Sequence, residues 1–192
     1  MEKWKERVVL KPMEIRKGFE VAVVKCPKAF VTEIKMVFPG QDLDGVLGVL
    51  TSQKSKLDLC ELGEDIAKEK DELLESFYDE AKRVAGALTK LDHWCDFIDP
   101  CSGLPVSIDT TLNLYFVYTF FLVEQALRKH TNRGYSEVDG FNVLLHFKTH
   151  SAGMCKVASH PRWGTNFYPA TIFTTAPYDV LEKILLGKVE KE

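Results

Sequence analysis

The residues best suited to chemistry lie in the C-terminal third of the sequence, around one cysteine and three histidines. Cys155 precedes His160 by five residues, and a thiolate beside an imidazole is an activated nucleophile. His146 and His150 are four residues apart, a spacing that on a helix could bind zinc or copper. Their surroundings instead predict a strand, where they would lie about 13 Å apart. We favour surface histidines over a metal site, and we disfavour a thiol hydrolase because Cys/His pairs occur by chance in most chains of this length.

Two further segments concentrate polar and reactive side chains. The first, residues 96–103, contains Asp96 and Asp99. These carboxylates could form an acid/base pair, but in such a turn they more often accept hydrogen bonds from the turn's own amides. In the second segment Lys156 follows Cys155, and a positive neighbour favours the thiolate. The alternative, which we favour from residue type alone, is a buried thiol on a strand.

The elements that must position these residues follow in an irregular order. Strands are predicted over residues 19–24, 46–51, 94–98, 112–120, 141–147, 154–158 and 165–174. Helices are predicted over residues 27–38, 69–91, 122–130 and 177–187. The clearest is 69–91, whose apolar residues recur every three or four positions along one stripe. Intermixed strands and helices predict a single α+β domain around one mixed or antiparallel sheet.

The amino-acid composition and net charge exclude several classes of protein function. The chain has 192 residues, 45% of them hydrophobic and 28% charged, as expected of one globular domain. A net charge of −3 argues against a nucleic-acid partner. The longest apolar run covers about a dozen residues, against about 20 for a bilayer span, so we expect no membrane partner. Common motifs such as G-x-G-x-x-G, G-x-S-x-G and H-E-x-x-H are absent, which lowers the expectation of an enzyme.

The cysteines and the N-terminus bear on location. An odd count of five cysteines, together with an N-terminus that lacks the apolar core of a secretory signal, predicts reduced thiols. We expect a cytoplasmic protein, with the mitochondrion as a second location.

The two polar segments are also where the chain resembles a known family. They read Trp94-x-Asp96-Phe97-Ile98-Asp99-Pro100-x-Ser102-Gly103-Leu104 and Cys155-Lys156-Val157-x-x-His160-x-x-Trp163-Gly164-Thr165. Both resemble the cobalamin trafficking protein D family, named for methylmalonic aciduria with homocystinuria type D. Supporting upstream matches are Cys26-Pro27, Phe38-Pro39, Thr51-x-Gln53-Lys54 and Glu72-Leu73-Leu74. The resemblance runs from residue 26 to about residue 185 and is loosest over residues 106–152.

This resemblance implies a nitroreductase-like α+β fold without bound flavin and without catalytic residues. Proteins of the family act as adaptors in vitamin B12 metabolism. They engage the cobalamin-processing type C protein and direct the vitamin toward the methionine synthase branch or the mitochondrial mutase branch. We therefore expect a non-enzymatic adaptor that binds no cofactor stably alone and contacts cobalamin through this partner.

The resemblance also implies a metal-contacting residue. A family cysteine is thought to ligate cobalt while the partner holds the vitamin, and it is the first of an adjacent pair. Here that first position is Met154 and the second is Cys155. We predict Cys155 as the metal ligand and as a cofactor contact, with Met154 as the second cofactor-binding candidate, since a thiolate is the softer and more strongly donating ligand.

The remaining expectations concern organisation and alternatives. We predict an N-terminal strand or extension over residues 1–25, the adaptor domain over 26–187 and a tail over 188–192. A homodimer is left open. The alternatives are a flavin-dependent nitroreductase-like oxidoreductase and a structural protein whose thiols have no role.

Overall fold

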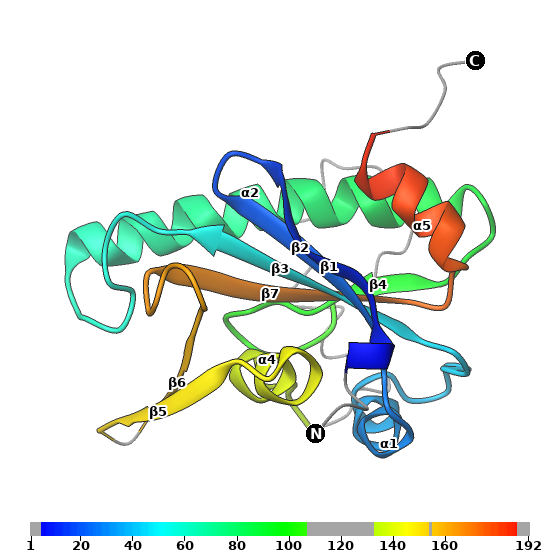
Figure 1. The fold of residues 1–192 in the computed structure, drawn as a ribbon, viewed down its shortest axis with the longest axis horizontal. Coiled ribbons are helices and arrows are strands. Elements are labelled where there is room, and N and C mark those ends of the chain that lie inside the picture. Colours follow the sequence, from blue (N-terminus) through cyan, green and yellow to red (C-terminus); the bar gives the residue numbers. More distant parts are fainter. Residues whose placement is uncertain (1–4, 107–132, 154, 188–192) are drawn as a thin grey trace, which may run out of the picture.

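Three layers make up the computed structural model, which describes residues 5–106, 133–153 and 155–187. The central layer is an antiparallel sheet with the strand order β1-β2-β3-β7-β4. Its strands are β1 (Val8–Arg16), β2 (Phe19–Lys25), β3 (Leu47–Lys54), β4 (Cys95–Phe97) and β7 (Phe167–Thr174). Helices α2 (Glu64–Thr89) and α5 (Tyr178–Leu185) cover one face, and α1 (Lys28–Val37) and α4 (Glu137–Leu145) lie on the other (Figure 1). A short 3-10 turn, Lys5–Arg7, precedes β1.

A separate two-stranded hairpin lies below the sheet beside α4 (Figure 1). It consists of β5 (Lys148–Ala152) and β6 (Cys155–Ser159), which are antiparallel. Because β6 continues through a short turn into β7, the hairpin is joined directly to the centre of the sheet.

The predicted α+β domain with an antiparallel sheet is confirmed. Helix α2 follows the predicted apolar stripe and begins five residues earlier than expected, at Glu64. Strand β1 is an element that the sequence pattern does not single out. The predicted strand over 112–120 and helix over 122–130 fall outside the described residues. No helix in the described ranges is long and apolar enough to cross a bilayer.

The prediction of a strand over residues 141–147 is wrong, because most of this segment belongs to helix α4. The segment fits both periods, because Phe141, Val143, Leu145 and Phe147 alternate as in a strand, whereas Phe141, Leu144 and Leu145 recur at helical spacing. The side chain of Ser136 caps the helix by accepting a hydrogen bond from the amide of Asp139 at 3.2 Å. The left-handed backbone of His146, at φ 56°, ends it.

The central strands are buried on both faces, which creates two separate apolar cores. Successive side chains of a strand point to opposite faces of a sheet. Ile172 accordingly packs in the core beneath α2 and α5, whereas Phe173 packs in the core against α1 and α4. On α2, the ring of Phe77 is fully buried and meets the ring of Phe97 edge-on, with centroids 5.6 Å apart.

Helix α4 is fastened to the sheet through a buried carboxyl group. The backbone amide of Thr171 on β7 donates to Oε1 of Glu137 at 3.1 Å, and the Thr171 hydroxyl is hydrogen-bonded to Oε2 at 2.5 Å. Burial raises the pKa of Glu137 to about 8, despite the opposing effect of these hydrogen bonds. At neutral pH the folded protein therefore keeps this carboxyl group protonated.

A pH-dependent stability follows from this proton. Unfolded Glu137 has a pKa near 4.5 and folded Glu137 a pKa of about 8, so between these values the folded state binds the extra proton. The contribution of this group is therefore fully present below pH 4.5 and is lost as the pH rises through about 8. We expect Glu137→Gln, which resembles the protonated form, to flatten this decline. The measurement is urea unfolding at several pH values across this window.

Glu33→Gln, at an exposed position of α1, is the matched control and should keep the pH dependence of the wild type. Equal pH dependence in Glu137→Gln and the wild type would contradict the assignment.

Candidate functional site

The predicted metal ligand lies at the end of the β5–β6 hairpin. Cys155 is exposed and pairs with Ala152 across the two strands. The ammonium group of Lys156 donates to the Asp139 carboxylate of α4 at 2.5 Å. Since neighbouring residues of a strand point to opposite sides, Cys155 points away from α4. Met154, the second candidate, lies outside the described residues.

The other four cysteines are poor thiolates. Burial raises the pKa of Cys26 to about 12 and raises that of Cys95 further. Burial, followed by the effect of a neighbouring carboxylate, also raises the pKa of Cys60 and Cys101. All four thiols therefore stay protonated at neutral pH. Cys155 is the cysteine that combines exposure with a position at a hairpin end.

A buried histidine organises the turn between β6 and β7. His160 is 3% exposed, and its Nε2 lies 3.0 Å from Oε1 of the equally buried Glu20 on β2. The backbone amides of Arg162 and Trp163 both donate to its Nδ1 at 3.2 Å. Nδ1 must therefore carry a lone pair, and the proton resides on Nε2, which donates to Glu20.

The same glutamate binds a second partner, the guanidinium of Arg162. Oε2 of Glu20 accepts a hydrogen bond from the guanidinium of Arg162, which also lies 3.5 Å from Oε1 of Glu14 on β1. Burial raises the pKa of Glu20, but the hydrogen bonds from His160 and Arg162, together with the positive charge of Arg162, outweigh it and leave the pKa below its usual value. Glu20 is thus a buried carboxylate that remains ionised.

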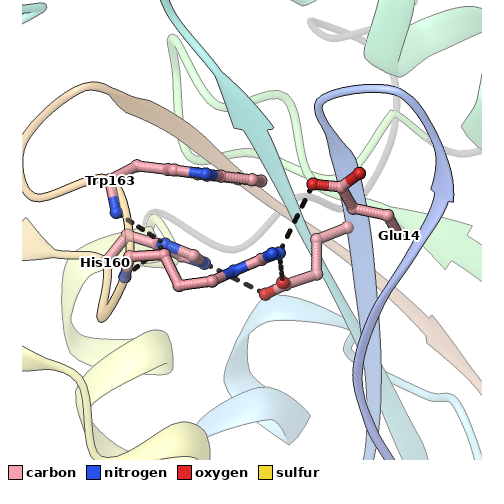
Figure 2. Close-up of polar contacts among 5 residues, drawn as sticks. Glu14, His160 and Trp163 are labelled. Carbon is pink, nitrogen blue, oxygen red and sulfur yellow. Dashed lines mark hydrogen bonds and ion pairs between the residues drawn. The ribbon is translucent and has the colours of Figure 1, made fainter.

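The indole of Trp163 completes this cluster. It stacks on the imidazole of His160 with the ring centroids 4.2 Å apart and an angle of 17° between the planes. Figure 2 shows Trp163 lying over His160, with Glu14 on the neighbouring strand. The guanidinium of Arg162 lies 5.0 Å from the centroid of the Trp163 ring. We call Glu20, His160, Arg162 and Trp163 the His160 cluster. It fixes the turn that follows the hairpin.

The structure does not bring Cys155 and His160 together as a nucleophile and base. Five positions along β6 separate them, which corresponds to about 16 Å in an extended strand. Both ring nitrogens of His160 already have partners. The imidazole is therefore a structural group, and the sequence expectation against a thiol hydrolase agrees with this geometry.

Of the two carboxylates of the 96–103 segment, Asp99 serves the turn and Asp96 lies on strand β4. Asp99 is buried and accepts hydrogen bonds from the amide of Cys101 at 3.1 Å and from the Ser102 hydroxyl at 2.6 Å. Asp96 accepts from the amide of Phe97 at 2.8 Å. The favoured interpretation, a turn capped by its own acidic side chains, is confirmed for Asp99, whereas the amide that Asp96 binds belongs to strand β4.

The two histidines considered as metal ligands occupy different elements. His146 ends helix α4, and His150 lies on β5. In the parts of the chain that the structure describes, no group of three or more His, Cys, Asp or Glu side chains is arranged to hold a metal ion.

Sequence reasoning did not find the partner of His160. Glu20 is separated from it by 140 residues along the chain, and no local spacing relates the two. A signal was nevertheless present, because Glu20 interrupts an otherwise apolar strand. A carboxylate in such a position needs buried hydrogen-bond donors.

Comparison with known proteins agrees with the resemblance found in the sequence. The family model of the methylmalonic aciduria and homocystinuria type D protein matches residues 4–119, and the chain belongs to this family. It is 34% identical over 161 residues to the human protein named cobalamin trafficking protein CblD, and 30% identical over 160 residues to the chicken protein of that name. Each match covers 83% of this chain and 47% of the relative. The chain thus spans about half the length of the curated relatives it matches.

Glu20 and Glu14 contact the same arginine, Arg162, but we expect their substitution to change the free energy of unfolding by very different amounts. Glu20→Leu should lower the free energy of unfolding by about 2 kcal/mol, because the buried Nε2–H of His160 loses its acceptor while the half-exposed Arg162 is rehydrated. Glu14→Leu should cost about 0.5 kcal/mol or less, since its contact with Arg162 is long and exposed. Urea unfolding at neutral pH measures both.

Acid titration provides an independent check. The stabilisation from Glu20 is present above its usual pKa of 4.5 and is lost as the pH falls through its lowered folded value. The difference between the wild type and Glu20→Leu should therefore shrink at acidic pH. A difference that stays constant would show that lost packing, and not the ionised carboxylate, is responsible.

Proposed function

We propose that this chain is a non-enzymatic adaptor in intracellular cobalamin trafficking. The observation that carries the proposal is membership of the type D protein family, together with relatives named cobalamin trafficking protein CblD. The roles found for Asp96, Asp99 and His160 support an adaptor over an enzyme, because each of these polar side chains hydrogen-bonds the protein's own backbone or side chains.

The fold of this adaptor is proposed to be nitroreductase-like, without use of flavin. Support comes from the sequence resemblance and from an antiparallel sheet covered by helices on both faces. The predicted domain boundary at residue 26 falls between β2 and α1. In this proposal β1 and β2 form the predicted N-terminal segment and add to the sheet of the 26–187 domain.

The partner is proposed to be the cobalamin-processing type C protein, with its bound vitamin, in the cytoplasm and also in the mitochondrion. The β5–β6 hairpin is a suitable contact, because it lies outside the five-stranded sheet and carries an exposed thiol at its end. With a net charge of only −3, the chain favours an interface formed by shape and apolar burial over long-range electrostatic attraction.

Cys155 is proposed to contact cobalt while the partner holds the vitamin. A thiolate is a soft ligand suited to a transition metal, and a thiol that coordinates a metal loses its proton. Lys156 contributes little to this deprotonation, since its ammonium group is engaged with Asp139. Met154 precedes Cys155 in the chain and is the second residue proposed to contact the vitamin.

Complex formation is the first test of the proposal. We expect the chain to bind free cobalamin weakly or not at all and to co-elute with the cobalamin-loaded type C protein in size-exclusion chromatography. The complex should survive high salt, because an apolar interface is insensitive to screening.

Absence of a complex at both low and high salt, with both proteins folded, would contradict the adaptor assignment. A stoichiometric flavin spectrum in the purified protein, with activity toward nicotinamide cofactors, would instead favour the flavin-dependent oxidoreductase.

The cobalt contact is tested by visible spectroscopy of the ternary mixture. Coordination of a thiolate should shift the corrin spectrum only when this chain, the partner and cobalamin are all present. Cys155→Ser should abolish the shift. Cys60→Ser and Cys101→Ser, which alter the other two exposed thiols, should leave it intact.

A shift that persists in Cys155→Ser and disappears in Met154→Ala would assign the contact to Met154. A ternary spectrum identical to that of the cobalamin-loaded partner alone would contradict the proposed cobalt contact. The adaptor proposal would still be tested by size-exclusion chromatography.

A further inference from the structure

An open pocket of about 580 Å³ lies at the end of the sheet where β3 finishes. One wall is the loop that follows β3, and the other is the turn between β6 and β7, which meet at the left of Figure 1. The lining residues are Lys54, Ser55, Lys56, Arg162, Trp163 and Asn166. Its size falls within the range of small-molecule sites, about 300–1,000 Å³.

The two walls are held together by hydrogen bonds, so the pocket has a defined shape. The amide of Ser55 donates to the carbonyl oxygen of Asn166 at 3.1 Å. The hydroxyl of Thr165 donates to the Asp58 carboxylate at 2.9 Å. The hydrogen bonds to Asp58, from the Cys60 amide first and then from Thr165, lower its pKa and keep it ionised.

A buried glutamate of α2 fixes the β3 loop from behind. The carboxylate of Glu69, which is 8% exposed, accepts the amide of Lys56 at 2.6 Å and the amide of Leu57 at 3.0 Å. On the opposite wall, the buried side chains of His160 and Glu20 hold Trp163 and Arg162 in place. Both walls are therefore positioned by buried side chains, Glu69 on one side and His160 and Glu20 on the other, that do not themselves line the pocket.

The polar side chains that line the pocket are mainly hydrogen-bond donors, and two of them lack partners. Within the described residues, the ammonium groups of Lys54 and Lys56 form neither a hydrogen bond nor an ion pair. The guanidinium of Arg162 pairs with the carboxylates of both Glu20 and Glu14. The cationic groups at the pocket that remain available to a ligand are therefore those of the two lysines, which are two residues apart and both border it.

This arrangement matches an anionic ligand with a flat ring. Ammonium groups bind phosphate oxygens as point charges, and an indole provides a surface on which planar ring systems stack. The carboxylates of Glu69 and Asp58 accept amide and hydroxyl donors, and within the described residues neither forms an ion pair with these lysines. A cationic ligand would lie beside two ammonium groups, whose repulsion disfavours it.

We propose that this pocket binds a small organic phosphate, with its phosphate group between Lys54 and Lys56 and its ring against Trp163. The site does not include Cys155 or the hairpin, so it is independent of the proposed cobalt contact. No sequence motif indicates this site, because Lys54 and Lys56 form no basic run and meet Arg162 and Trp163 only through the pairing of the two loops.

The test is NMR of the indole N–H resonances with three probes: AMP, inorganic phosphate and adenosine. The Trp163 resonance is assigned by its loss in Trp163→Phe, which keeps an aromatic ring over His160. We expect a saturable shift of this resonance with AMP, a weaker affinity for inorganic phosphate, and the weakest for adenosine. The double variant Lys54→Gln/Lys56→Gln should lower the affinity for AMP about tenfold or more, as expected for the loss of charge-assisted hydrogen bonds.

The matched control is Lys35→Gln/Lys183→Gln, which removes the same charge from exposed positions on α1 and α5 at the other end of the molecule (Figure 1). It should change the affinity by no more than about twofold, because screening weakens distant charges. The proposal is overturned if neither AMP nor inorganic phosphate gives a saturable shift. Adenosine binding as tightly as AMP, or equal losses of affinity in the two double variants, would also overturn it. Complex formation with the type C protein is measured separately, so a failure here does not affect the adaptor proposal.

Discussion

Strand β7 makes structural contacts along both of its edges and on both of its faces, and the other layers are organised around it. It pairs with β3 over its whole length and with β4 on its other side. Ile172 and Phe173 belong to opposite cores, and Thr171 binds the buried carboxyl group of Glu137 on α4. The turn that carries His160 leads directly into this strand. The hairpin and the pocket therefore take their positions from one central strand.

Two buried glutamates of this protein reach opposite protonation states for a simple reason. Glu20 faces an imidazole N–H and a guanidinium, which stabilise a negative charge even in a buried position. Glu137 faces only the amide and hydroxyl of Thr171, which do not offset the loss of water, so it retains its proton. Glu20 stabilises the fold at pH values above the acidic range. Glu137 stabilises it at pH values below about 8. Together they limit the range in which the fold is most stable.

The sequence predicted the elements with strong periodicity or β-branched runs, namely α2 and the strands β2, β3 and β7. It failed over residues 141–147, because the apolar residues of this short segment fit both the strand period and the helix period. The capping role of Asp99 was predictable, since its partners lie within three residues. The contact between Glu20 and His160 and the approach of Lys56 to Trp163 were not predictable, because they depend on how distant strands align.

The ion pair between Lys156 and Asp139 has a consequence for the neighbouring thiol of Cys155, the first residue of strand β6. In a two-stranded hairpin, a register shift by one residue exchanges the two faces. Such a shift would turn Lys156 away from α4 and bring Cys155 against the helix. Although both partners are half exposed, at 51% and 56%, and such pairs contribute little stability, this one distinguishes between the two registers. It opposes the alignment in which the thiol would be hidden, and so keeps the sulfur on the outer side of the hairpin.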